Sequence, residues 1–228
     1  CNPIARKLKL YDIYGVDTVN GVLCGNTILC KYYSPFFQYG VDNGMYVKSM
    51  AEISGGFIVL FDALKEYATD DCLIFDVRDF GGFVKSPVGN IFSDKFVLLS
   101  ILCQINYLIY GIDKWIKEEI PAKLRFAYLL YYSLLRVIPQ INNRINTHFI
   151  LDEKWNNDNF RNAMAHYKLG VALKEKDLIY DDIMFGLTDH IFGEGYIVVK
   201  KSIYLQLEKL AIQIGDYLKL KKGLVSSR

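Results

Sequence analysis

One short segment of the sequence combines side chains that could act on a phosphate ester. Arg161, Asn162 and His166 lie within the stretch "FRNAMAH". A guanidinium stays charged and can hold two phosphate oxygens while negative charge builds. An unperturbed imidazole titrates near about pH 6.5, so it can accept a proton from a hydroxyl and return one to a leaving oxygen. The residue types therefore favour acid–base chemistry at a bound phosphate.

A helix must position these side chains. Its predicted inward stripe has apolar residues at spacings typical of a helix: Phe160, Met164, Tyr167 and Val171. Asn162 and His166 are four residues apart and share a different face. Arg161 precedes His166 by five residues, which is about 140° around an ideal helix. The two side chains therefore need the long arginine arm, or a second subunit, to converge.

The spacing resembles the signature of the HEPN superfamily (higher eukaryotes and prokaryotes nucleotide-binding), an Arg and a His separated by four to six residues. Here Arg161 and His166 enclose four residues, and the polar Asn162 directly follows the arginine. A polar residue at that position is common in members that cleave RNA. The resemblance covers roughly residues 93–220, whereas residues 1–92 match no pattern that we recognise.

The resemblance implies an endoribonuclease that needs neither metal nor cofactor, with an active site assembled at a twofold interface of a homodimer. One His166 would act as base and the other as acid, paired Arg161 side chains would clamp the phosphate, and Asn162 would orient His166 or the phosphate. The expected products are a 2′,3′-cyclic phosphate and a 5′-hydroxyl. Relatives of this kind serve in phage defence or as toxins, so an antitoxin or regulatory partner is also expected.

Two other interpretations remain open. The helical bundle could be a non-catalytic HEPN-fold module that binds RNA, a nucleotide or a partner protein. Alternatively, Arg161 and His166 could serve only packing and hydrogen bonding. Replacing His166 with Ala distinguishes a catalytic histidine, whose loss abolishes cleavage with folding intact, from a core histidine, whose loss lowers the melting temperature.

The elements around the motif predict a mainly α fold. Residues 93–228 are expected to form an antiparallel bundle of four long helices. Ser93 is suited to cap a helix that runs to about residue 111, and Pro121 to begin one that Pro139 kinks or ends. The polar cluster at 155–159 offers caps for the motif helix. The last helix has one apolar stripe: Val199, Ile203, Leu207, Leu210, Ile214 and Tyr217.

Residues 1–92 are predicted to form a mixed α+β or irregular extension. The flanks of Gly25-Asn26 are β-branched and aromatic, which favours a hairpin turn there. Residues 45–67 are predicted to be an interrupted helix and residues 72–75 a strand.

Composition limits the class of protein. The 228 residues are 52% hydrophobic with a net charge of +2, which excludes a disordered chain and a strongly basic nucleic-acid wrapper. The uncharged run at 96–112 falls short of a membrane span, so we expect a buried helix and no membrane partner. Five cysteines without a CxxC pair, and no secretory signal before Cys1, favour a reducing cytoplasmic location.

Charge is distributed unevenly along the chain. Residues 1–92 carry 8 basic and 10 acidic side chains, and the remainder carries 19 and 15. An RNA backbone is therefore expected to meet the second half. The residues proposed for such a groove are Lys114, Lys117, Lys123, Arg125, Arg136, Arg144, Lys200, Lys201 and the C-terminal lysines Lys219, Lys221 and Lys222. An ordinary charged outer face remains the alternative. We do not expect a metal site at Asp181, Asp182, Asp189 and His190, because acidic residues on loops and helix surfaces are usually just solvated.

Overall fold

The computed structural model describes residues 13–19, 21–26, 71–76, 80–81, 83–86, 89–166, 173–221 and 225. The described part of the chain is mainly helical, which confirms the predicted fold class. The predicted helix at 45–67 lies outside the described residues, as do Tyr167 and Val171 of the predicted motif stripe.

The central helix begins where the sequence predicts. Helix α4 spans Asp94–Asn106, and its N-cap Ser93 accepts a hydrogen bond from the Phe96 backbone N at 3.3 Å while its hydroxyl donates to the carbonyl of Phe80. The helical path continues through a π-helical segment, η4 (Tyr107–Ile112), into α5 (Asp113–Trp115). This stretch is apolar enough to cross a membrane, yet 61% of its most apolar window is buried inside the protein. It is therefore a core helix, as predicted.

Helix α6 spans Pro121–Ile145 and begins with proline in its first turn. It does not end at Pro139, so that alternative is wrong; it continues to Ile145, where Asn146 adopts a left-handed conformation with φ 52°. The buried side chains of Ile138 and Ile141 on either side of the proline hold the last turns against the core. Their burial compensates for the one backbone hydrogen bond that a proline removes.

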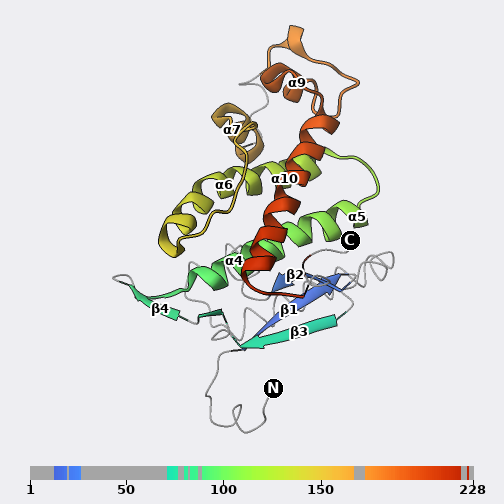
Figure 1. Ribbon diagram of the computed structural model, residues 1–228. Helices are drawn as coiled ribbons and strands as arrows, with labels where there is room; N and C mark the ends of the chain where they lie inside the picture. Colours follow the sequence, from blue (N-terminus) through green and yellow to red (C-terminus); the bar gives the residue numbers. More distant parts are fainter. Residues whose placement is uncertain are drawn as a thin grey trace.

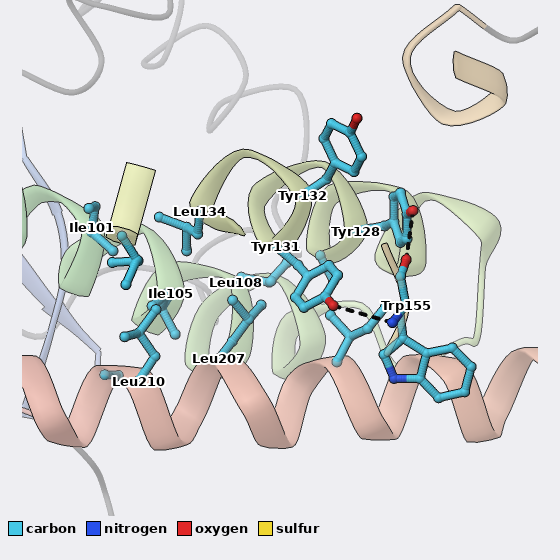
Figure 2. Close-up of a cluster of buried hydrophobic side chains, with 14 of the residues drawn as sticks. Ile101, Ile105, Leu108, Tyr128, Tyr131, Tyr132, Leu134, Trp155, Leu207 and Leu210 are labelled. Atoms are coloured by element: carbon cyan, nitrogen blue, oxygen red, sulfur yellow. Dashed lines mark hydrogen bonds between the residues drawn. The ribbon is translucent and has the colours of Figure 1, made fainter. Parts of the chain in front are cut away.

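Helix α10 (Tyr196–Tyr217) follows the short α9 (Leu187–Phe192). Figure 1 shows α6 running back over α4 in the opposite direction and α10 crossing both. The predicted stripe of α10 is buried from Val199 to Ile214, and Tyr217 is half-buried. In Figure 2, Leu207 and Leu210 of α10 pack toward Ile105 and Leu108, which forms the centre of the core.

The described strands form two small antiparallel sheets. Strands β1 (Ile13–Val19), β2 (Val22–Asn26) and β3 (Asp71–Asp76) have the order β2-β1-β3, and β4 (Phe83–Ser86) pairs with β5 (Gly89–Phe92). The strand predicted at 72–75 is confirmed within β3.

The hairpin predicted at Gly25-Asn26 is misplaced. Those two residues lie in β2, where they pair with Asp17 and Val16. The turn falls instead at Gly21, whose φ of 75° suits the second position of an Asn-Gly turn.

Strand β2 packs against α4. Leu23 is fully buried in the same core as the helices, and its carbonyl accepts a hydrogen bond from the Asn106 side chain at 2.8 Å. Strand β2 therefore shares a core with the bundle, while a domain boundary at residue 92 stays a prediction.

Candidate functional site

The candidate site lies on helix α7, which spans Asp158–His166 and lies alongside α6 (Figure 1). The polar cluster before α7 supplies its cap, as predicted: Asn157 Oδ1 accepts a hydrogen bond from the Phe160 backbone N at 2.9 Å. Phe160 and Met164 are buried, which confirms the described half of the inward stripe. The opposite face of α7 is left for polar residues.

Two buried tyrosines of α6 anchor the segment that leads into α7. The Tyr128 hydroxyl lies 2.9 Å from the Trp155 carbonyl and 3.0 Å from the Asn157 carbonyl, and it accepts from Asn157 N at 3.1 Å. The Tyr131 hydroxyl donates to the Asp152 carbonyl at 2.6 Å and accepts from Trp155 N (Figure 2). Burial raises the pKa of Tyr131 to about 12, so it stays a neutral donor. These contacts fix where α7 begins.

Arg161 lies on a partly exposed flank of α7. Its Nη1 donates to Asn162 Oδ1 at 2.9 Å, and its guanidinium carbon lies 6.0 Å from the centre of the Tyr132 ring. The structure thus brings Arg161 and Asn162 together. The side chain is oriented by neighbours on two helices and remains accessible to an anion.

A cluster that the sequence analysis missed surrounds Tyr132. The Tyr132 hydroxyl hydrogen-bonds to the Asp158 carboxylate and accepts from Arg136 Nη2 at 2.7 Å. The hydrogen bond to Asp158 raises the pKa of Tyr132. Arg136 also lies 5.1 Å from the ring centre, so two guanidinium groups flank one aromatic ring beside α7. The i,i+4 spacing of Tyr132 and Arg136 indicates that the two side chains are neighbours on one helix, but only the fold shows that they face α7.

His166 is exposed on the same helix, five residues after Arg161. Among the described residues, no hydrogen bond joins it to Arg161 or Asn162. Asn162 hydrogen-bonds to Arg161, and its role in orienting His166 or the phosphate stays a prediction. Arg161 and His166 lie on flanks of one α-helix that are about 140° apart, so their convergence needs the long arginine arm or a second subunit.

Part of the predicted basic groove is wrong. Lys123 and Lys200 are 2% and 6% exposed, so neither can meet an RNA backbone. Lys200 Nζ lies 2.8 Å from Asp113 Oδ1 and 2.7 Å from Glu119 Oε1, and Lys123 Nζ lies 3.5 Å from the same Asp113 oxygen. Burial alone would raise the pKa of Glu119, but its hydrogen bond and attraction to Lys200 outweigh burial and lower it. These lysines join α5, α6 and α10 into one core.

Arg144 also forms an ion pair, with Asp94. Its Nη2 lies 2.6 Å from Asp94 Oδ1, which links the end of α6 to the start of α4. The hydrogen bond to Asp94 raises the pKa of Arg144. Of the proposed groove, Arg125 and Arg136 both contact α7 residues.

A pocket of about 370 Å³ opens beside α7. Its walls come from the first turn of α6, from Ala163 and Met164 of α7, and from residues 183–185. The lining is almost entirely apolar except for Arg125, whose Nε donates to the Met164 carbonyl at 2.6 Å.

One acidic residue of the segment 181–190, Asp182, has structural partners. Asp182 Oδ1 accepts hydrogen bonds from the backbone N of Met184 and of Gly186, both at 2.8 Å. Within the described part of the chain, no group of three or more His, Cys, Asp or Glu side chains is arranged to hold a metal ion.

Comparison with known protein families, curated proteins and solved structures finds no match to this chain.

Proposed function

We propose that this protein is a metal-independent endoribonuclease that acts in the cytoplasm. The observation that carries the proposal is the placement of an exposed His166 and an accessible Arg161 on one helix, α7, whose start is firmly anchored. A histidine needed only for packing would be buried, whereas this one is open to a substrate. The motif's resemblance to HEPN ribonucleases supplies the reaction class.

The proposed reaction is an internal transfer. The imidazole of one His166 accepts the proton of a ribose 2′-hydroxyl, and the 2′-oxygen forms a bond to phosphorus. The bond from phosphorus to the 5′-oxygen breaks, and the second His166 donates a proton to that oxygen. Arg161 holds the non-bridging oxygens as charge develops, and Asn162 keeps the guanidinium in place through its 2.9 Å hydrogen bond.

Arg161 and His166 lie on different flanks of α7, and a homodimer would let the side chains of two copies converge on one phosphate. Helix α10 carries exposed apolar side chains at seven-residue intervals, Val198, Leu205 and Ile212, which are 49%, 47% and 44% exposed. Ser202 on α10 accepts a hydrogen bond from Trp155 Nε1 at 2.8 Å, so α10 adjoins the segment leading into α7. Such a stripe supports contact with a second copy of this chain.

The test of the function is cleavage of a fluorescent single-stranded RNA in the presence of EDTA. We expect His166→Ala to lower the rate by about 100-fold or more, the usual contribution of a general acid or base. His148→Ala removes another exposed histidine outside α7 and serves as the matched control. Equal rates for the two variants, or equal loss with both melting temperatures lowered, would refute the proposal.

A second candidate is a non-catalytic module that binds RNA, a nucleotide or a partner such as an antitoxin. The pocket beside α7 favours it, because 370 Å³ is a volume typical of small-ligand sites. Expression in bacteria separates the candidates. A toxic or antiviral ribonuclease slows growth and its His166→Ala form does not, while a binding module is tolerated equally in both forms.

A further inference from the structure

The pocket beside α7 has a rigid rim formed by the turn at residues 182–186. Asp182 Oδ1 binds two backbone N–H groups of this turn, those of Met184 and Gly186. Gly186 has φ 82°, and a Cβ there would lie 2.9 Å from Ile179 Cγ1. Only glycine fits this position without strain, so the turn is built to hold one shape.

Phe185 is the unusual residue of this turn. It has a left-handed φ of 54°, which is disfavoured for a residue with a bulky side chain. Its neighbour Met184 is buried at 4% exposure, whereas Phe185 lines the pocket and stays 42% exposed. The strained backbone therefore directs an aromatic ring to a solvent-accessible wall instead of into the core.

The remaining walls match the chemistry of a nucleotide. Ala163 and Met164 supply part of an apolar lining, and the cavity of about 370 Å³ lies in the range of small-ligand sites. Arg125 places a guanidinium in the wall, and Arg161 lies on the same helix as Ala163 and Met164. An unpaired nucleotide presents the complementary pair of features, a flat ring that stacks on aromatic side chains and an anionic phosphate.

We infer that this pocket binds one unpaired nucleobase of the RNA substrate, with Phe185 stacking on the base. The inference rests on the proposed ribonuclease function and extends it to substrate choice. A base held beside α7 would bring its flanking phosphates toward the motif. The protein would therefore cut single-stranded or looped RNA and spare duplex RNA, whose bases cannot leave their stack without cost.

Binding is measured by fluorescence anisotropy with fluorescein-labelled octa-adenylate, using protein that carries His166→Ala so that the RNA stays intact. Phe185→Ala is expected to weaken binding by about 5- to 100-fold, the usual effect of removing one stacked aromatic. Phe185→Tyr keeps the ring and should restore binding to within about twofold. Tyr180→Ala removes a 73% exposed aromatic that does not line the pocket and should have no effect.

A base-free anion separates stacking from charge. Labelled polyphosphate should bind the Phe185→Ala form as well as the parent protein. Equal weakening for RNA and polyphosphate, or no effect of Phe185→Ala on RNA binding, would overturn the inference.

Cleavage by the otherwise wild-type enzyme distinguishes this inference from the proposed function. We expect Phe185→Ala to raise KM and leave kcat largely unchanged. If cleavage depends on His166 but its KM is unchanged by Phe185→Ala, the base site alone is refuted. Binding that depends on Phe185, in a protein that never cleaves RNA, would refute the ribonuclease function alone.

Discussion

The substitution Tyr128→Phe tests how the fold fixes the start of helix α7. It removes one hydroxyl and keeps the ring, whose edge-to-face contact with Phe160 has a centroid distance of 4.5 Å. The lost hydroxyl is the partner of the Asn157 backbone N and lies within 3.0 Å of the carbonyls of Trp155 and Asn157. Tyr128 is fully buried, so water does not replace it.

The expected loss follows from the groups left without a partner. A buried donor or acceptor that loses its hydrogen bond costs about 1–3 kcal/mol. The substitution leaves the buried Trp155 carbonyl in that state, and the part-buried Asn157 N–H adds a smaller cost, about 1 kcal/mol. We expect the free energy of unfolding to fall by about 2–4 kcal/mol. For a chain of this size that corresponds to a drop in melting temperature on the order of 10 °C.

Urea unfolding followed by circular dichroism measures this change. Ser133→Ala is the matched control on the same helix, because its exposed hydroxyl donates only to the Leu129 carbonyl, at 2.8 Å. We expect the control to change stability by less than about 0.5 kcal/mol. If Tyr128→Phe behaved like Ser133→Ala, the hydroxyl would not anchor α7 and this part of the account would be refuted.

Three further predictions concern pH, the buried ion pairs and the dimer. Burial raises the pKa of Tyr131 to about 12, above the value of about 10 in an unfolded chain. The free energy of unfolding should therefore hold below about pH 10 and fall as the pH rises toward 12. Equal urea midpoints at about pH 9 and about pH 11 would contradict this. Lys200→Met leaves Asp113 and Glu119 without their closest cation, and we expect it to lower the free energy of unfolding by about 2 kcal/mol. This is less than for a fully buried pair, because both acids are partly exposed. The substitution of an exposed lysine, Lys209→Met, should be neutral in the same unfolding assay. If each active site needs both His166 side chains, mixing equal amounts of wild-type and His166→Ala protein under subunit exchange should leave about one quarter of the wild-type activity; a value of one half would show independent sites.

Local signals made much of the helical fold predictable. The caps Ser93 and Asn157 and the initial Pro121 act within one turn of their own helix, so their side-chain chemistry is readable without knowing the fold. The hairpin was harder, because the sequence offers two turn dipeptides, Asn20-Gly21 and Gly25-Asn26, within seven residues. Pairing of β1 with β2 selected Gly21 over Gly25, and that choice depends on register.

Long-range pairing explains the main error on surface charge. Lys200 meets Glu119 across 81 positions of sequence, and a lysine alone in a sequence is expected to be exposed. The candidate site was likewise predictable only within its own helix. The order of Arg161, Asn162 and His166 places them on α7, but Tyr132, Arg136 and the pocket wall at 183–185 reach α7 only through the tertiary fold.

We propose that His166 and Arg161 of α7 catalyse the transfer of a phosphoryl group within RNA. The test is mass spectrometry of the products from an oligonucleotide that contains one ribonucleotide in an otherwise 2′-deoxy strand. The fully 2′-deoxy strand is the control. We expect a single cut after the ribonucleotide, leaving a 2′,3′-cyclic phosphate and a 5′-hydroxyl, and no cut in the fully 2′-deoxy strand. Cleavage of the fully 2′-deoxy strand, or unchanged cleavage by His166→Ala, would contradict the proposal.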